Sequence, residues 1–229
     1  MGELPATARL DALAARFLEA ELRVRGLLRQ VLDGDRRTLL VEALAVLLAL
    51  RRDAHRASAN VEYAYLISAL AMQALTGRPA VGTPVGGTAL GARLAAYLDR
   101  LLVGADANAR TAFATARPDN LADAEHLAVT GRIDRSGRRL TLAPEAEMLT
   151  RTSGVHAITR ATRDNIGDAP ATINFAPGSD AACHNGAGTG SYPPFHPNCR
   201  CLASPPGVTR AEHLAAMSDA LNASDLARA

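Results

Sequence analysis

The spacing of hydrophobic residues predicts a mainly α-helical chain. Between Thr7 and Leu32 the apolar residues recur every three or four positions, with arginine and glutamate between them, which is typical of an amphipathic helix. Turn residues at 33–35 end this pattern. Further helices are then predicted at 38–60, 61–75, 88–102, 106–117 and 120–129. Another helix opens at Pro144 and ends near Gly167, with Gly154 as a candidate break.

Short β patterns occur only in the second half of the chain. Residues 131–142, GRIDRSGRRLTL, place Ser-Gly between two short stretches and predict a small hairpin. Residues 171–177, ATINFAP, form a β-like run that leads to the first cysteine. A last short helix is predicted from Thr209, where Thr209 and Glu212 have the spacing of a capping box. The expected fold class is therefore mainly α: a helical N-terminal region followed by a small α+β C-terminal module with a Cys/His-rich loop.

Proline and glycine mark one internal linker. The segment TGRPAVGTPVGG holds two prolines and four glycines, and we assign residues 77–87 to a Gly/Pro linker. No Gly-Lys-Ser/Thr follows it and no strand precedes it, so a plain connector is favoured over a phosphate-binding loop. The predicted division is a helical N-terminal region at 1–76, this linker, a helical middle region with the hairpin at 88–143, and a C-terminal module at 144–229.

Composition narrows the function classes. All 25 basic residues are arginine, and with 23 acidic residues the formal net charge is only +2, too small for a protein that coats nucleic acid. Aromatic residues make up 3% of the chain and tryptophan is absent, so the core must be aliphatic, which suits helix packing. The N-terminus lacks the features of a secretory signal, and the most apolar stretch, 39–50, is too short to cross a bilayer and is interrupted by Glu42. We therefore expect no membrane partner.

Cysteine and histidine cluster near the C-terminus. Three cysteines in a chain without an export signal do not suggest a disulfide framework. Their proximity in sequence to histidines points to metal or redox chemistry. Zinc takes four thiolate or imidazole donors in a tetrahedron. Cys183, His196, Cys199 and Cys201 supply that number, with His184 as a substitute ligand should Cys201 point away. A structural zinc ion is the expected cofactor.

Prolines shape the backbone of this cluster. Pro193 and Pro194 favour an extended chain, and Pro197 fixes the turn after His196. The His-x-x-Cys-x-Cys segment can therefore wrap a centre instead of continuing as a helix.

Several alternatives stay open at this cluster. The cysteines could form one disulfide from Cys183 to Cys199 or Cys201, or remain reduced and packed as small apolar groups. Cys199 with His196 could serve a cysteine-dependent hydrolase or transferase. A small DNA-binding module would use nearby arginines such as Arg200 and Arg210. The other histidines, His55, His126, His156 and His213, each lie alone on a predicted helix, where a surface or partly packed position is expected.

The stretch SDAACHNGAGTGSYPPFHPNCRC, residues 179–201, resembles the C-terminal signature of phage head morphogenesis proteins of the Mu F type. In that family an Asp and a Cys-x-x-Cys precede Pro-Pro-x-His-Pro-Asn-Cys-Arg-Cys-Thr. Asp180 and Cys183 match the first part, and residues 193, 194 and 196–201 match the second. Gly186 stands where the second cysteine of the first pair would be, and Leu202 replaces the final Thr. The resemblance covers about residues 145–205.

The resemblance implies a structural role and no enzymatic activity. Proteins of this family are minor capsid proteins, present in few copies, that act in head assembly. The implied partners are the portal protein and other head proteins, with packaged DNA as a further candidate. The implied location is the virion, at the capsid interior or portal vertex, after assembly in the host cytoplasm.

Overall fold

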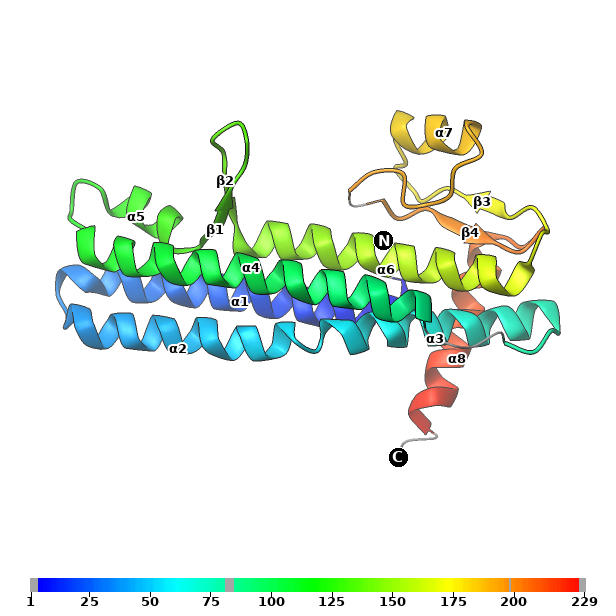
Figure 1. The fold of residues 1–229 in the computed structure, drawn as a ribbon, viewed down its shortest axis with the longest axis horizontal. Helices are drawn as coiled ribbons and strands as arrows, with labels where there is room; N and C mark the ends of the chain where they lie inside the picture. Colours follow the sequence, from blue (N-terminus) through cyan, green and yellow to red (C-terminus); the bar gives the residue numbers. More distant parts are fainter. Residues whose placement is uncertain (1–3, 81–84, 198, 227–229) are drawn as a thin grey trace. The chain divides into compact units, whose positions relative to one another are not determined.

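The fold is mainly α-helical, as the sequence predicts, and the described residues also form two small antiparallel sheets (Figure 1). The computed structural model describes residues 4–80, 85–197 and 199–226. The first half consists of the 3-10 turns η1 (Pro5–Thr7) and η2 (Gln30–Leu32) and the helices α1 (Ala8–Arg29), α2 (Arg36–Ala54), α3 (Ala57–Thr76) and α4 (Val85–Thr115). The second half consists of α5 (Leu121–Ala128), β1 (Thr130–Ile133), β2 (Arg139–Thr141), α6 (Leu142–Ile166), β3 (Thr172–Asn174), α7 (Ala181–Gly188), β4 (Leu202–Ser204) and α8 (Arg210–Leu226).

Helix boundaries differ from the predicted ones at three places. The second helix ends at Ala54, not near residue 60, and α3 begins at Ala57. The two helices predicted at 88–102 and 106–117 are one helix, α4. Gly104 lies between the two predicted ranges, and glycine costs about 1 kcal/mol inside a helix. The structure gives it a packing role, since a Cβ at Gly104 would collide with the backbone of Gly131 in β1.

The segment assigned to a linker, 77–87, follows α3 and overlaps the start of α4. Gly77–Ala80 is not helical, and Gly77 has a positive φ of 67°. Residues 81–84 lie outside the described residues, and α4 then begins at Val85, so the last part of the predicted linker belongs to a helix.

The chain groups into two compact units, each discontinuous in sequence. Unit 1 takes the residues up to Asp11, Ala57–Leu94 and the residues from Met148 onward, and unit 2 takes Ala12–Arg56 and Ala95–Glu147. The sequence analysis divides the chain into successive stretches, because hydrophobic periodicity reports local structure and carries no information on which distant segments meet.

Unit 2 contains most of α1, all of α2 and the hairpin β1–β2. Its buried hydrophobic side chains are aliphatic apart from two phenylalanines, Phe17 and Phe113. The buried Glu21 is satisfied twice: its carboxylate pairs with Arg25 at 2.9 Å and accepts the backbone N–H of Ala143 at 2.9 Å. The predicted hairpin is confirmed, with Thr130 opposite Thr141 and Ile133 opposite Arg139.

Unit 1 contains α3, α8, most of α6 and the second sheet. Its core combines residues from both ends of the chain: Leu4, Tyr63, Ile67, Met72, Ile158, Leu202 and Met217. Gly154 does not break α6, since a Cβ there would meet the side chain of Thr7 at 2.6 Å, so this glycine allows close packing.

The second sheet joins the predicted strand to one that the sequence analysis did not identify. β3 pairs with β4, with Thr172 opposite Ser204 and Asn174 opposite Leu202. The predicted capping box is confirmed, since the Glu212 carboxylate accepts the backbone N–H of Thr209 at 2.8 Å. None of the described helices is both long and apolar enough to span a membrane.

Candidate metal site

Cys183 is positioned by the first turn of α7. The Asp180 side chain caps this helix by accepting the backbone N–H of Cys183 at 3.0 Å. This hydrogen bond, together with the nearby His196 ring, lowers the pKa of the Asp180 carboxyl. The helix was not predicted, because Ala181–Gly188 contains two glycines and reads as a loop. Asp180 followed by alanines was the one available signal, since aspartate is a favoured N-cap residue.

His196 and Cys199 reach the same point from the loop that precedes β4. A turn between them is closed by the hydrogen bond from the Cys199 N–H to the His196 carbonyl at 3.1 Å. The prolines do not simply extend the chain as predicted, because the Pro193–Pro194 peptide bond is cis. Asn198 of the motif lies outside the described residues.

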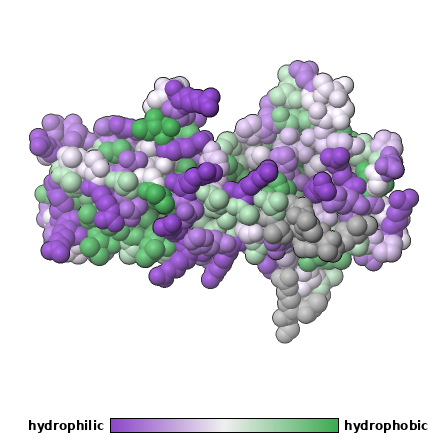
Figure 2. All heavy atoms as spheres, in the orientation of Figure 1, coloured by the Kyte–Doolittle hydropathy of each residue, from purple (hydrophilic) through white to green (hydrophobic). Residues whose placement is uncertain are grey.

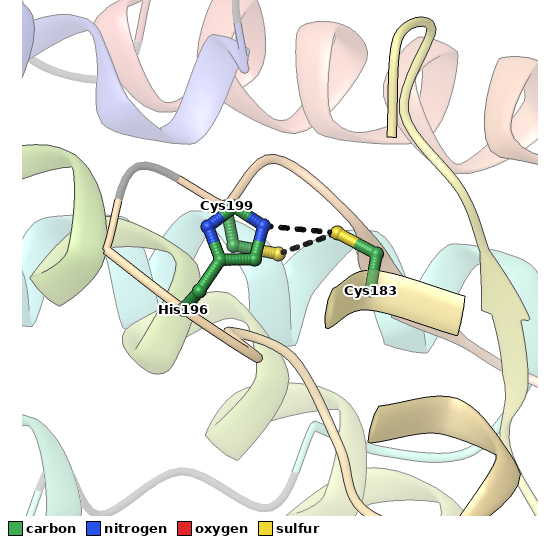
Figure 3. Close-up of side chains that lie close together, drawn as sticks. All are labelled: Cys183, His196 and Cys199. Carbon is green, nitrogen blue, oxygen red and sulfur yellow. Dashed lines mark hydrogen bonds between the residues drawn. The ribbon is translucent and has the colours of Figure 1, made fainter. Parts of the chain in front are cut away.

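The three side chains converge in Figure 3. One donor atom from each of Cys183, His196 and Cys199 lies within 4.8 Å of the other two, so this group could hold a metal ion. The Cys183 sulfur lies 3.8 Å from the Cys199 sulfur and 3.1 Å from Nε2 of His196. Two segments that are 13 residues apart in sequence therefore supply one cluster.

The two ring nitrogens of His196 have different environments. Nδ1 lies 2.7 Å from the carbonyl oxygen of Pro197, and it must carry the proton to donate to that oxygen. Nε2 lies 3.1 Å from the Cys183 sulfur and 3.4 Å from an Asp180 carboxylate oxygen, and in the neutral tautomer with the proton on Nδ1 it would be available to a metal. A histidine whose far nitrogen is tied to a backbone carbonyl is the usual arrangement of a metal ligand.

Cys201 lies beside this group. Its sulfur is 3.4 Å from the Cys183 sulfur, and it accepts a hydrogen bond from the backbone of Ala176. It does not belong to the set of three whose donor atoms are all mutually close. Sequence reasoning named all four residues, and the structure brings all four into one region.

Burial controls the chemistry of the sulfurs. Cys183, Cys199 and Cys201 are at most 2% exposed. Burial raises the pKa of Cys183 to about 12, and it also raises the pKa of Cys201. The sulfur separations of 3.8 and 3.4 Å exceed the disulfide bond length of about 2.0 Å, so the cysteines are free thiols in this structure. A nucleophilic cysteine is usually accessible to its substrate, whereas these three sulfurs are buried.

The remaining predicted residues have structural contacts. His184 is exposed, stacks on Phe175 with ring centroids 4.2 Å apart, and lies outside the group of three. Arg210 is half-buried and donates to the carbonyl oxygen of Arg200 at 2.9 Å, which ties α8 to the end of the motif. This contact engages one guanidinium nitrogen of Arg210 within the protein.

One expectation for the histidines is wrong. His213 was expected at the surface or partly packed, but it is fully buried. Its Nδ1 lies 2.7 Å from the Ser204 hydroxyl, which places α8 against β4. The helical pattern around it could have shown this, since Leu214 and Met217 in the same helix also pack in the core of unit 1.

No family model, curated protein or solved structure matches this chain. Its function must therefore be inferred from its own residues and their geometry.

Proposed function

We propose that this protein is a minor head-morphogenesis protein of the Mu F type, with a structural zinc site in unit 1. The observation that carries the proposal is the convergence of Cys183, His196 and Cys199, with Cys201 in contact. These are the residues on which the resemblance rests. A local motif that folds into one compact cluster supports common ancestry more strongly than the same letters spread over unrelated surfaces.

The structure also shows why Gly186, at the position where the family has a further cysteine, is a glycine here. Gly186 lies on α7, and a Cβ there would collide with the ring of Phe195. Phe195 packs against the buried cluster formed by Ala176 and the three cysteines. The Phe195 ring therefore occupies the space that a second cysteine on this helix would need. The fourth ligand of the proposed site would then be Cys201.

Zinc suits the donors that are present. Zinc–sulfur bonds of about 2.3 Å at tetrahedral angles place two thiolates roughly 3.8 Å apart. The Cys183 and Cys199 sulfurs are separated by 3.8 Å. His196 directs Nε2 at Cys183, and Cys201 would complete the count of four. Four protein ligands would make a closed structural site, where the ion stabilises the fold and leaves no position for a substrate.

The metal is tested by measuring zinc in the protein purified under reducing conditions. We expect about one zinc per chain by elemental analysis, and a cobalt-substituted protein with the charge-transfer absorption of cobalt–thiolate bonds. Cys183→Ser and Cys199→Ser should each lose most of the metal, because each removes a thiolate ligand.

His184→Ala is the matched control for His196→Ala. Both remove one imidazole within the same motif, but only His196 belongs to the converging group. Full zinc in the His184 variant and loss in the His196 variant would support the assignment. Metal-free wild-type protein with an intact fold would contradict it.

The role in the particle needs a separate test. Particles of the source phage or prophage are purified, and peptides of this chain are quantified by mass spectrometry against the portal protein. A low, fixed ratio to the portal is expected for a minor head protein. Absence from both finished particles and assembly intermediates would contradict the head-protein proposal and leave the metal result untouched.

A further inference from the structure

The hairpin β1–β2 holds an unusual share of the charge of the protein. Residues 131–139, GRIDRSGRR, contain four arginines and one aspartate, a formal charge of +3. The whole chain carries only +2, so everything outside these nine residues sums to −1. The hairpin projects from the helices of unit 2 (Figure 1), and hydrophilic residues gather at the end of this projection (Figure 2).

The turn of the hairpin is held in one conformation. The backbone N–H of Asp134 donates to the carbonyl of Arg138, and that of Gly137 donates to the carbonyl of Asp134, both at 3.0 Å. Gly137 has a φ of 83° and ends the turn in the left-handed region, which glycine adopts more readily than other residues. The Asp134 carboxylate accepts from the backbone of Ser136 and of Arg138 at 2.8 and 2.9 Å. The single acid of the hairpin therefore serves to fix the turn.

Two of the four arginines brace the base of the hairpin. Arg132 pairs with the buried Glu145 at 2.5 Å, and Arg139 pairs with Asp123 at 2.6 Å. The close approach of the Gly131 backbone to α4 adds a third point of attachment. The base is thus held to the helices of unit 2.

The other two arginines remain at the tip. Arg138 is 75% exposed, and its ion-pair distance to Asp134 is long, 3.7 Å. Arg135 is exposed, and among the described residues no acidic side chain forms an ion pair with it. A rigid, anchored ribbon therefore presents two guanidinium groups to solvent.

We propose that the hairpin tip, residues 134–138, binds the phosphate backbone of double-stranded DNA. A two-stranded ribbon is narrow enough to enter the major groove, which is about 12 Å wide. Arginine donates in a planar fork that matches phosphate oxygens. A membrane surface is disfavoured, because Ile133 is the only large apolar side chain exposed on the hairpin. The proposal is independent of the Cys/His cluster and of the proposed role in phage heads.

The test is a fluorescence anisotropy titration of a labelled 20-base-pair DNA duplex with the full chain over a series of NaCl concentrations. The variant is Arg135→Ala combined with Arg138→Ala. Each lost phosphate contact reduces the slope of log affinity against log salt by about 0.9, so the slope should fall by roughly 2. We expect affinity at low salt to drop at least about fivefold.

The matched control is Arg23→Ala combined with Arg37→Ala, which removes the same charge from two other exposed arginines of unit 2. Wild-type affinity in this control, with thermal unfolding unchanged in both variants, would support the hairpin as the contact. Equal weakening in both variants would overturn the proposal, since net charge alone would then explain binding. No binding by the wild type at low salt, or stronger binding to phosphatidylserine vesicles or duplex RNA than to DNA, would also overturn it.

Discussion

At the scale of single residues, two histidines show how position decides chemistry. His196 is part-exposed, and its Nε2 lies close to both the Cys183 sulfur and the Asp180 carboxylate. His213 is fully buried, and only one of its nitrogens has a partner: Nδ1 contacts Ser204, and Nε2 finds none among the described residues. A proton on Nε2 would be buried without an acceptor, and Arg210 lies nearby with a positive charge. Burial first, and Arg210 second, lower the pKa of His213 to about 4.

This buried histidine should make unit 1 sensitive to acid. In the unfolded chain a histidine has its ordinary pKa of about 6.5, so the unfolded state binds an extra proton as the pH falls from 6.5 toward 4. Stability is therefore greatest above pH 6.5 and decreases as the pH falls to about 4, by an amount on the order of 3 kcal/mol. The measurement is the free energy of urea unfolding from pH 7 to pH 4.

His213→Asn provides the comparison, because its amide can still reach Ser204 but does not titrate. We expect the variant to lose less stability between pH 7 and pH 4 than the wild type does. Parallel pH profiles in the two proteins would show that His213 does not cause the acid sensitivity.

At the scale of elements, α7 depends on one capping residue. Asp180 satisfies the Cys183 N–H at the start of a helix that has two glycines in eight residues. Such a helix has little intrinsic stability, since each glycine costs about 1 kcal/mol. The cap and the buried cluster therefore hold it together.

Asp180→Ala should loosen α7 and weaken metal binding together. Loss of an N-cap costs about 1 kcal/mol. Because Cys183 lies in the first turn, we expect the zinc affinity, measured by competition with a chromophoric chelator, to fall. Asp180→Asn, which retains a capping oxygen, should bind zinc nearly as well as the wild type. An equal loss in both variants would instead indicate that the charge next to His196 matters.

The elements also show what the sequence could and could not predict. The amphipathic helices, the hairpin at 131–142 and the Thr209–Glu212 cap were predictable because each follows from local spacing. The candidate ligands followed from residue type alone. The continuity of α4 through Gly104 and of α6 through Gly154 was not predictable. Each glycine is needed because a segment distant in sequence packs too closely against it for a Cβ. β4 was missed since a three-residue strand is defined by its partner and not by its own pattern.

At the scale of the whole molecule, residues near the start of the described chain contribute to the core of unit 1. Leu4 is 6% exposed and belongs to the same core as Leu202 and Met217. Leu202 directly follows the last cysteine, so this core and the Cys/His cluster share a stretch of backbone. A substitution at Leu4 should therefore also reduce the burial of the cysteines near residue 201.

Leu4→Ala should destabilise unit 1 by about 2 kcal/mol or more, the usual cost of emptying a buried leucine site. We expect faster alkylation of the three cysteines in the metal-free protein, measured by mass spectrometry in mild denaturant. Leu18→Ala, at a side chain that is 51% exposed, is the control and should leave the alkylation rates unchanged. Identical protection in the two variants would argue against this coupling.

The discontinuity of unit 1 also matters during synthesis. Residues 4–11 leave the ribosome about 190 residues ahead of the strand that carries Leu202. At ordinary elongation rates this delay is roughly 10 to 40 s. During this delay Leu4 and Ala6 lack their core partners Leu202 and Met217, although the partners on α3 emerge early. The three cysteines emerge before α8, which completes the unit. The cluster cannot form before residue 201 is made, and metal capture there would stabilise a unit whose distant segments have only just met.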